Sequence, residues 1–319
     1  MPARKSPKGE SVPGAGGGPR LGRSRPRHGE RVIRIGLVAA ALVSIATTIG
    51  IVVSLIEPSA RFFGEVSVKE FFTGTEWTPL FEPPHYGVLP LVAATLLITV
   101  IALLVALPLG LASAIYLSEY ATPRTRKVLK PALELLAGIP TVVFGFFALK
   151  FLTPRLQSIW PWGEGPDIFN ALSAGLVMGM MIIPTIASLS EDALSAVPHS
   201  LRDGAYAMGA SKRVVATTVV VPAALSGIVA AFVLGVSRAV GETMIVAIAS
   251  GNRPNLSWNP LEAMQTMTGF IAQAASGDVP VGTVDYHTLF AVGLLLFTLT
   301  FAMNAVSIRL VRRFREVYE

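Results

Sequence analysis

Two opposite charges lie within a long apolar run near the C-terminal third of the chain. Arg238 and Glu242 stand four residues apart in the stretch from Ala231 to Ser250, so one continuous helix would place them on the same face. A charged side chain at bilayer depth costs roughly 2.5–3.5 kcal/mol on insertion scales, and by default it marks a functional site. A fixed cation with its own counter-ion at this depth indicates a path for an anion.

The same pair also allows a structural interpretation, in which an Arg–Glu ion pair joins two helices of a bundle and meets no substrate. A helix from about Ala223 to Ser250, rising about 1.5 Å per residue, would place Arg238 close to the bilayer midplane. The composition alone favours transport only slightly over this alternative, and both remain open at this point.

The composition is that of an integral membrane protein. Of the 319 residues, 52% are hydrophobic and 14% are charged, with a mean hydropathy of +0.60, whereas soluble domains contain about 25% charged residues. The net charge of +6 does not indicate nucleic-acid binding, because the basic residues gather at the two termini and in short loops, as on the cytoplasmic side of membrane proteins. Without cysteine and with four scattered histidines, the chain is predicted to hold no disulfide and no metal.

Apolar runs predict an all-α integral membrane protein with six transmembrane helices. Residues 1–31 are rich in Gly, Pro, Arg and Lys, so we expect a disordered basic cytoplasmic tail before a single domain over 32–319. Basic residues place both termini in the cytosol, which an even number of spans requires, and the count of spans then places residues 190–222 in the cytosol as well. The expected spans are about Val32–Ile56, Val88–Leu117, Leu129–Leu152, Ala171–Leu189, Ala223–Ser250 and Thr288–Leu310.

Glycine and proline mark two special helices. Gly138, Pro140 and Gly145 interrupt the third span, where a proline frees a carbonyl and bends the helix. In the fourth span, the spacing Gly175-x-x-x-Gly179 permits close contact with a neighbouring helix.

The polar segment at 190–222 contains a regular spacing of small residues and proline. It resembles the EAA loop of ABC-transporter permeases, whose pattern is Glu-Ala-Ala, three residues, Gly, nine residues, Ile, one residue, Leu-Pro. The departures are Asp for Glu, Gly for the first Ala, and Val for both Ile and Leu. The pattern predicts a short helix, a tight Gly turn and a second helix; an ordinary amphipathic loop is the alternative. The resemblance implies that contacts to a cytosolic ATPase come from Asp203, Gly204, Ala205, Gly209, Val221 and Pro222.

Two further stretches narrow the resemblance to the phosphate-specific ABC permeases. Glu134-Leu-Leu-Ala-Gly-Ile-Pro140-Thr-Val-Val-Phe-Gly145 is similar to their third-span signature, and Ser237-Arg-Ala-Val-Gly-Glu-Thr-Met244 to their fifth-span signature. The continuation through Gly251-Asn252 is typical of the C-type (PstC) subunit and not of its A-type sister. The similarity covers about residues 32 to 310.

This resemblance implies a type I ABC importer permease fold with a cytoplasmic coupling helix, in a bacterial inner membrane. The implied partners are a sister permease of the A type, two copies of a cytosolic ATPase, an external phosphate-binding protein and membrane lipid. Phosphate would pass Arg238, Glu242 and Thr243, with Glu242 holding Arg238 when the site is empty. The chain would be a non-catalytic subunit without a cofactor, because ATP is bound by the partner and no Gly-x-x-x-x-Gly-Lys-Ser/Thr loop is present.

Three other functions are weighed against phosphate import. An ABC permease for sulfate, molybdate or another oxyanion would share the coupling loop, but the fifth-span stretch fits phosphate better. A self-sufficient ion-driven transporter or channel would not explain the coupling loop. A membrane-embedded enzyme is the least favoured, because the chain contains no His-Glu-x-x-His or Gly-x-Ser-x-Gly motif.

Overall fold

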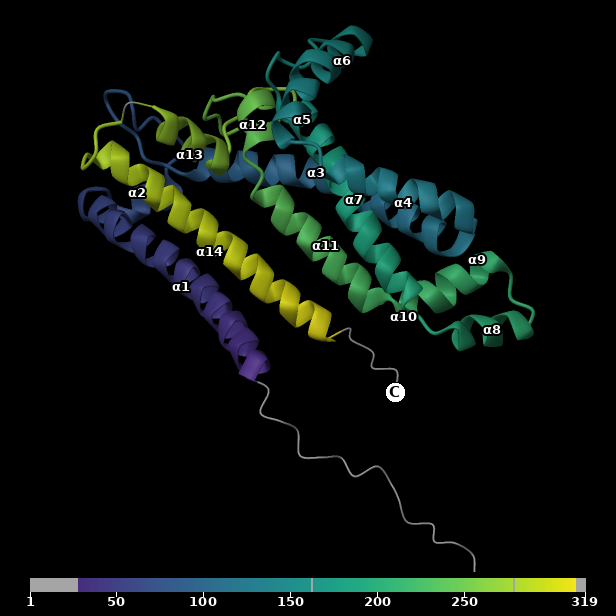
Figure 1. Ribbon diagram of the computed structural model, residues 1–319. Coiled ribbons are helices and arrows are strands. Elements are labelled where there is room, and N and C mark those ends of the chain that lie inside the picture. Colours follow the sequence, from purple (N-terminus) through teal and green to yellow (C-terminus); the bar gives the residue numbers. More distant parts are fainter. Residues whose placement is uncertain (1–27, 162, 278, 314–319) are drawn as a thin grey trace, which may run out of the picture. The chain divides into compact units, whose positions relative to one another are not determined.

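The computed structural model describes residues 28–161, 163–277 and 279–313, and the regular secondary structure of these residues is helical (Figure 1). The bounds of the helices, with π-helical segments labelled η, are α1 His28–Glu65, α2 Val68–Thr73, α3 Leu89–Ile115, η1 Tyr116–Tyr120, α4 Pro123–Ala137, α5 Thr141–Phe147, η2 Ala148–Leu152, α6 Thr153–Ile159, α7 Ala171–Ser195, α8 His199–Ala207, α9 Lys212–Val214, η3 Val215–Val220, α10 Val221–Ala223, α11 Leu225–Val240, α12 Met244–Ala249, α13 Met267–Ser276 and α14 Val284–Arg313.

The chain consists of two units, one ending at Ile51 and one beginning at Val52. The described part of the first unit, residues 28–51, is the N-terminal part of α1, whose apolar run confirms a helix at the first predicted span. The helix begins at His28 and continues to Glu65, so it is longer than the predicted 32–56. Of the predicted basic tail, residues 1–27 lie outside the described residues.

The centre of the second unit is the pair of helices α3 and α7. Small and medium apolar side chains recur every four residues along α3, from Ala94 through Ile98 and Ala102 to Ala106, and all four are buried. The facing stripe of α7 contains Gly175 and Gly179, where an added Cβ would lie 2.7 Å from the Ile101 side chain or 2.8 Å from the Ala102 carbonyl. The predicted close contact of this glycine pair is confirmed, because the missing side chains let the two helices touch.

The limits of the third span differ from the prediction. The helix breaks at Gly138–Pro140, since a proline lacks the N–H for the helical hydrogen bond and clashes with the preceding turn. The preceding part is a separate helix, α4, in which no residue is fully buried. The apolar span runs over Thr141–Ile159 instead of 129–152. Gly145 lies inside α5 and permits contact with α12, where a Cβ would lie 3.0 Å from Ile248, so it does not bend the span.

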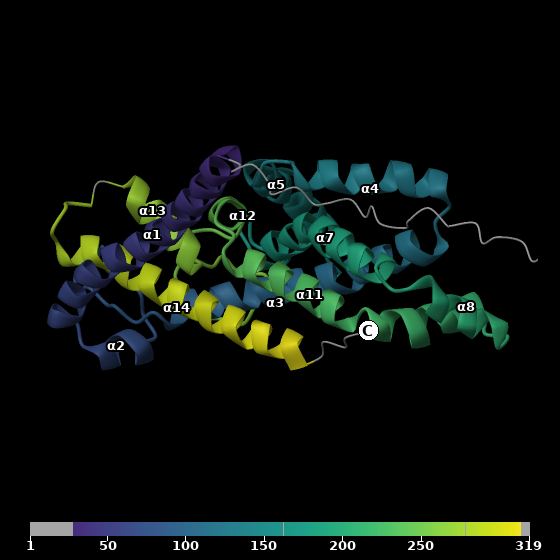
Figure 2. The same cartoon turned by 60° about the horizontal axis from the view of Figure 1, so that its bottom comes forward.

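Among the described residues, five helices are long and apolar enough to cross a membrane, and a sixth span results when the bent pair of Lys212–Ala223 and Leu225–Val240 counts as one. The second and fourth spans are close to their predicted limits, and the last begins at Val284. Helices α8 to α10 lie at one end of this unit and α12 and α13 at the other (Figures 1 and 2). We call the end that contains α8, α9 and α10 the coupling end.

We expect Gly179→Val to destabilise the protein by about 1–3 kcal/mol, because the new Cβ would meet the backbone carbonyl of Ala102, which cannot move away like a side chain. The control is Gly204→Ala, where nothing lies within 4 Å of the added Cβ and helix propensity improves. Thermal unfolding of the purified protein in detergent measures both. Equal melting temperatures of the two variants would contradict the proposed close packing of α3 and α7.

Candidate functional site

The stretch with the two predicted pathway charges is not one continuous helix. Helix α11 ends at Val240, residues 241–243 are non-helical, and α12 begins at Met244. The Glu242 carboxylate accepts hydrogen bonds from the backbone N–H groups of Met244 at 3.1 Å and Ile245 at 3.3 Å. The first N–H groups of a new helix have no carbonyl partner within that helix, and the capping side chain supplies the acceptor instead.

The predicted ion pair between Arg238 and Glu242 is therefore wrong. Residues four apart meet only when the helix between them is continuous, and here the break turns Glu242 away into the cap of α12. Glu242 is 8% exposed, and its carbonyl accepts a hydrogen bond of 2.7 Å from the Thr268 hydroxyl. Residue 242 thus ties the 241–243 break to the first turn of α13, whose bounds are Met267–Ser276.

Arg238 has a different environment. Its guanidinium Nε and Nη2 lie 3.4 and 3.1 Å from the sulfur of Met181 on α7, and within the described chain no carboxylate lies within 4.0 Å of it. The residue is half-buried and stands in the last turn of α11. The partial negative charge of the helix C-terminus stabilises a cation there. The guanidinium fork is thus stabilised in place without being neutralised, so it can bind an anion with two parallel hydrogen bonds.

Thr243, the third predicted pathway residue, lies in the same break. Its hydroxyl is 3.5 Å from the Gly241 carbonyl and does not cap α12, because the Glu242 carboxylate does so. Thr243 therefore lies in the non-helical segment 241–243, which begins three residues after Arg238.

The polar segment at 190–222, which we call the coupling segment, has the predicted order of a short helix, a glycine turn and a second helix. Helix α8 ends at Ala207, the chain turns at Gly209, and the Ser211 hydroxyl caps α9 by accepting from Val214 N–H. Gly209 has φ +83°, a left-handed conformation that residues with a Cβ rarely adopt. Its N–H donates to the Tyr206 carbonyl at 2.9 Å, which closes the turn.

The six predicted coupling residues do not share one role. Asp203, Gly204, Gly209 and Pro222 are exposed and can meet a partner, and Val221 is half-buried. Ala205 is buried in a cluster with α7, η3 and α11 residues that include Leu194, Val215, Val220 and Ile228. The small size of Ala205 therefore serves the packing of α8 on the body of the protein.

The residue that anchors α8 was not predicted from the sequence. Arg202 donates to the carbonyls of Leu194 at 2.8 Å and Val197 at 2.5 Å, at the C-terminal end of α7. The same guanidinium forms an ion pair of 3.0 Å with Glu119 in η1, and both side chains are at most 10% exposed. The only signal in the sequence is a glutamate directly after a long apolar run, and nothing local indicates its partner 83 residues away.

A second missed cluster joins α4 to α7. Glu191 is fully buried and pairs with Arg126 and, at 2.7 Å, with Lys130. Lys130 also pairs with Asp192 at 2.7 Å, and the hydrogen bonds to Asp192 and Glu191 raise the pKa of Lys130 above its usual range. These pairs hold the basic helix α4 against the C-terminal part of α7. From the sequence, basic residues in loops were used only to predict which side of the membrane a loop faces.

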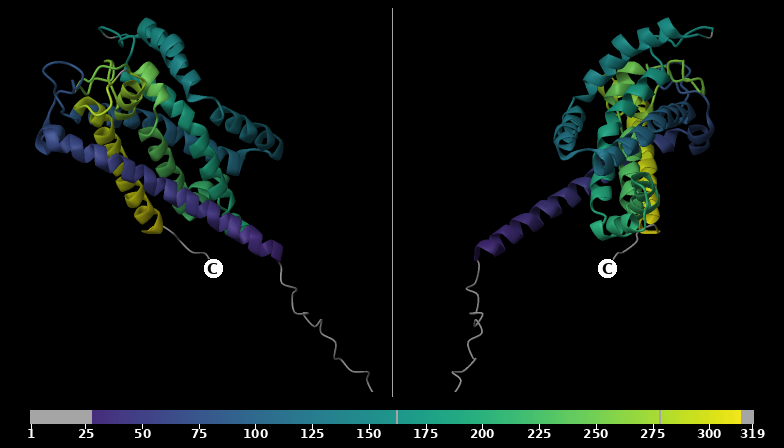
Figure 3. Two further views of the ribbon diagram at one scale, coloured as in Figure 1. Left: turned by 60° about the vertical axis from the view of Figure 1, so that its left-hand side comes forward. Right: turned by 90° about the vertical axis from the view of Figure 1, so that its right-hand side faces the viewer.

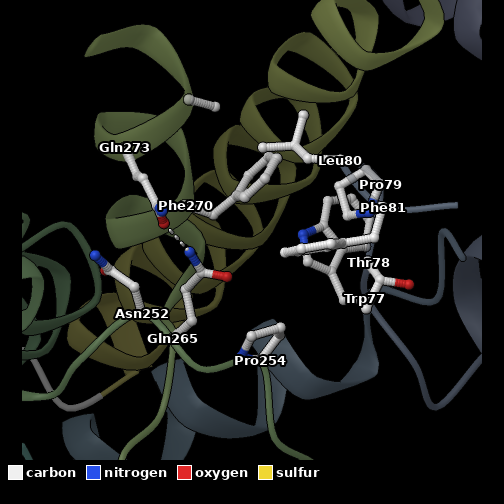
Figure 4. A pocket seen from close by; sticks show the side chains of 11 residues that line it. Trp77, Thr78, Pro79, Leu80, Phe81, Asn252, Pro254, Gln265, Phe270 and Gln273 are labelled. Carbon is white, nitrogen blue, oxygen red and sulfur yellow. Dashed lines mark hydrogen bonds between the residues drawn. The ribbon is translucent and has the colours of Figure 1, made fainter. Parts of the chain in front are cut away.

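At the opposite end, a hollow of about 70 Å³ lies between the loop at 77–81 and α13 (Figure 4). Aromatic side chains line it together with amides, and Gln265 donates to Gln273 at 2.6 Å. The buried indole N–H of Trp77 has no hydrogen-bond partner among the described residues. None of the predicted pathway residues lines this hollow.

Comparisons with known proteins agree with this geometry. Residues 106–316 match the family described as "Binding-protein-dependent transport system inner membrane component". The probable ABC transporter permease protein YqgH of Bacillus subtilis (strain 168) is 38% identical over 84% of this chain and 86% of its own length. The phosphate transport system permease protein PstC of Xylella fastidiosa (strain 9a5c) is 34% identical over 74% of this chain and 76% of its own.

Two solved structures have the same fold. A bacterial ABC transporter involved in the import of alginate matches with a TM-score of 0.61 at 14% identity, covering 91% of this chain and all of that one. The MetNI methionine ABC transporter matches with a TM-score of 0.52 at 20% identity, covering 72% and 95%.

The fold and the coupling segment define the permease class of type I ABC importers. The chain belongs to the binding-protein-dependent transport system inner membrane component family. It is a multi-pass inner-membrane permease, and membership of this family implies an ATPase and a substrate-binding protein as partners.

We expect Arg202→Met to lower the free energy of unfolding by about 3–5 kcal/mol, because it leaves the Glu119 carboxylate buried without a cation. Adding Glu119→Leu should recover much of that loss, since the double variant buries no charge. Thermal unfolding of the four members of this mutant cycle tests the pair. Additive losses in the double variant would show that Arg202 and Glu119 do not interact energetically.

Proposed function

We propose that this chain is a permease subunit of an ATP-driven phosphate importer and that Arg238 contacts the anion on its way through the membrane. The observation that carries this proposal is a guanidinium in an apolar span with no carboxylate partner in the described chain. The relatives named PstC, at 30–34% identity, support phosphate as the anion. Neither support depends on the Arg–Glu pair that the sequence suggested.

Each pathway residue receives a role from its surroundings. Arg238 offers two parallel N–H donors to phosphate oxygens, and its charge is held by the end of α11. Glu242 is a positioning residue, because its carboxylate holds the break that ends α11 directly after Arg238. Thr243 offers a hydroxyl beside the same break. One such cation binds an anion without holding it so tightly that release becomes slow.

In this proposal the chain works with a sister permease of the A type, two ATPase copies and an external phosphate-binding protein. The termini and the coupling end face the cytosol, where the exposed residues of α8 and the Gly209 turn enter a groove of the ATPase. The chain holds no cofactor of its own, and the ATPase supplies the energy. A bend of 72° between Lys212–Ala223 and α11 connects this contact to the helix with Arg238.

Arg238→Ala should abolish ATP-dependent phosphate uptake by the complete complex in proteoliposomes, because the anion loses its only nearby cation in this span. Arg238→Lys should retain little, since an ammonium cannot reproduce the two-pronged guanidinium contact. Arg253→Ala, in an exposed loop, is the matched control and should transport normally. Labelled phosphate, with sulfate as competitor, is the measurement. Undiminished uptake by Arg238→Ala would remove the residue from the path, and strong competition by sulfate would replace the substrate.

Gly209→Glu should prevent stable binding of the ATPase, because a Cβ at φ +83° strains the turn and a charge fills the contact surface. Gly209→Asn should bind nearly as well as the wild type, since Asn tolerates this conformation. Gly282→Glu is the matched control, because Gly282 has φ +89° and open space but lies before α14. Co-purification of the ATPase measures the effect. Equal ATPase recovery with all three variants would contradict a coupling role for this turn.

A further inference from the structure

The exposed face of α11 forms one stripe that passes beside Arg238. Ala230, Leu234 and the C-cap residue Gly241 are exposed, and their spacings of four and seven residues place them on the same side of the helix. Ser237 and Arg238 lie one turn after Leu234, at the two edges of this stripe. Ser237 contacts α14 and Arg238 contacts α7. An anion on the stripe at this level would lie between Ser237 and Arg238.

A second polar side chain, that of Asn304, lies at the edge of the stripe opposite Arg238. The Ser237 hydroxyl donates to the Asn304 side-chain carbonyl at 2.6 Å, which joins α11 to α14. Helices α11 and α14 pack against each other, and Figure 1 and the left view of Figure 3 show them running side by side. Asn304 is exposed, although it belongs to the apolar span Val284–Arg309.

The bond to Ser237 uses the acceptor of Asn304 and leaves its donors unused. No atom of the described chain accepts a hydrogen bond from the Asn304 amide nitrogen. An exposed amide in a membrane span is costly when it faces lipid, so it is expected to face water, a partner or a substrate. The Asn304 carbonyl oxygen already accepts one hydrogen bond, whereas the amide N–H groups have no acceptor in the described chain, so the side chain offers donors, which suit an oxyanion.

We propose that Asn304, oriented by Ser237, is a second anion contact in the same path as Arg238. The inference rests on the proposed function, in that it assumes an anion travels along α11. Arg238 supplies the charge from the α7 side, and the Asn304 amide supplies neutral N–H donors from the α14 side. A neutral donor adds hydrogen bonds without adding charge, which favours recognition while keeping release possible.

The competing explanation is that the Ser237–Asn304 bond only joins two helices. Interhelical hydrogen bonds in membranes contribute about 0.6 kcal/mol on average. If this were the whole role, removing either partner would have the same small effect. If the amide contacts the anion, removing Asn304 must cost more than removing Ser237.

The test compares Ser237→Ala, which removes the interhelical bond but leaves the amide, with Asn304→Leu, which removes both. Thr298→Val is the matched control, because Thr298 is also exposed on α14 but bonds only to the Leu294 carbonyl of its own helix. Concentration-dependent phosphate uptake is measured in proteoliposomes that contain the complete complex, after co-purification and thermal unfolding have verified assembly. We expect Asn304→Leu to raise the apparent KM about tenfold or more, the effect of one charge-assisted hydrogen bond. Ser237→Ala should raise it only slightly, and Thr298→Val not at all.

Equal effects of Ser237→Ala and Asn304→Leu would overturn the proposal and leave the bond a structural contact. An Asn304→Leu complex that fails to assemble is replaced by Asn304→Asp, which keeps the acceptor for Ser237, lacks the amide donors and should also raise KM. Failure of the proposed function is separately visible, because the wild-type complex would then not transport phosphate. In that case the same variants are measured with the oxyanion that is transported, and an unchanged KM for that anion would refute Asn304 as a contact.

Discussion

A charge in an apolar span has to be stabilised by something other than water, and the fifth span solves this by breaking its helix. The break at 241–243 creates a helix C-terminus beside Arg238 and a helix N-terminus at Glu242. Each helix end carries a partial charge opposite to its neighbouring side chain. The two charges are therefore stabilised separately, and the guanidinium is not consumed by an internal ion pair.

The charges at the coupling end follow the opposite arrangement. Arg202 is paired with Glu119 and with two carbonyls, and Glu191 with two cations, in surroundings that are largely buried. A buried charge left alone would destabilise the protein by several kcal/mol, so such complete pairing holds η1, α4, α7 and α8 in one arrangement. The contrast separates two kinds of charge among the described residues: the paired ones hold helices together, whereas Arg238 has no carboxylate partner, as its proposed contact with an anion requires.

Hydropathy and glycine patterns were sufficient to predict the all-α class, the approximate spans and the helix–turn–helix form of the coupling segment. These features are local: Gly209 favours its turn through its left-handed conformation, and the spacing of Gly175 and Gly179 permits a close helix contact. The break at 241–243 was not predicted, because it depends on which backbone N–H groups the Glu242 carboxylate caps. The limits of the third span were wrong for another reason: the prediction continued one span through Pro140, whereas the helix breaks there. The Arg202–Glu119 pair was not predictable either, since periodicity carries no information about contacts across 83 residues.

The anchoring of α8 determines how an event at the coupling end can reach Arg238. Ala205 of α8 packs in the same cluster as Leu194 of α7, Val220 of η3 and Ile228 of α11. Close-packed clusters transmit displacement because they cannot be compressed. Because Arg202 ties α8 to the end of α7, we expect a push on α8 by a bound partner to pass through η3 and the bend before Leu225 into α11. The free charge stands at the far end of that helix, next to the break, where a small rotation of α11 changes the surroundings of the guanidinium most.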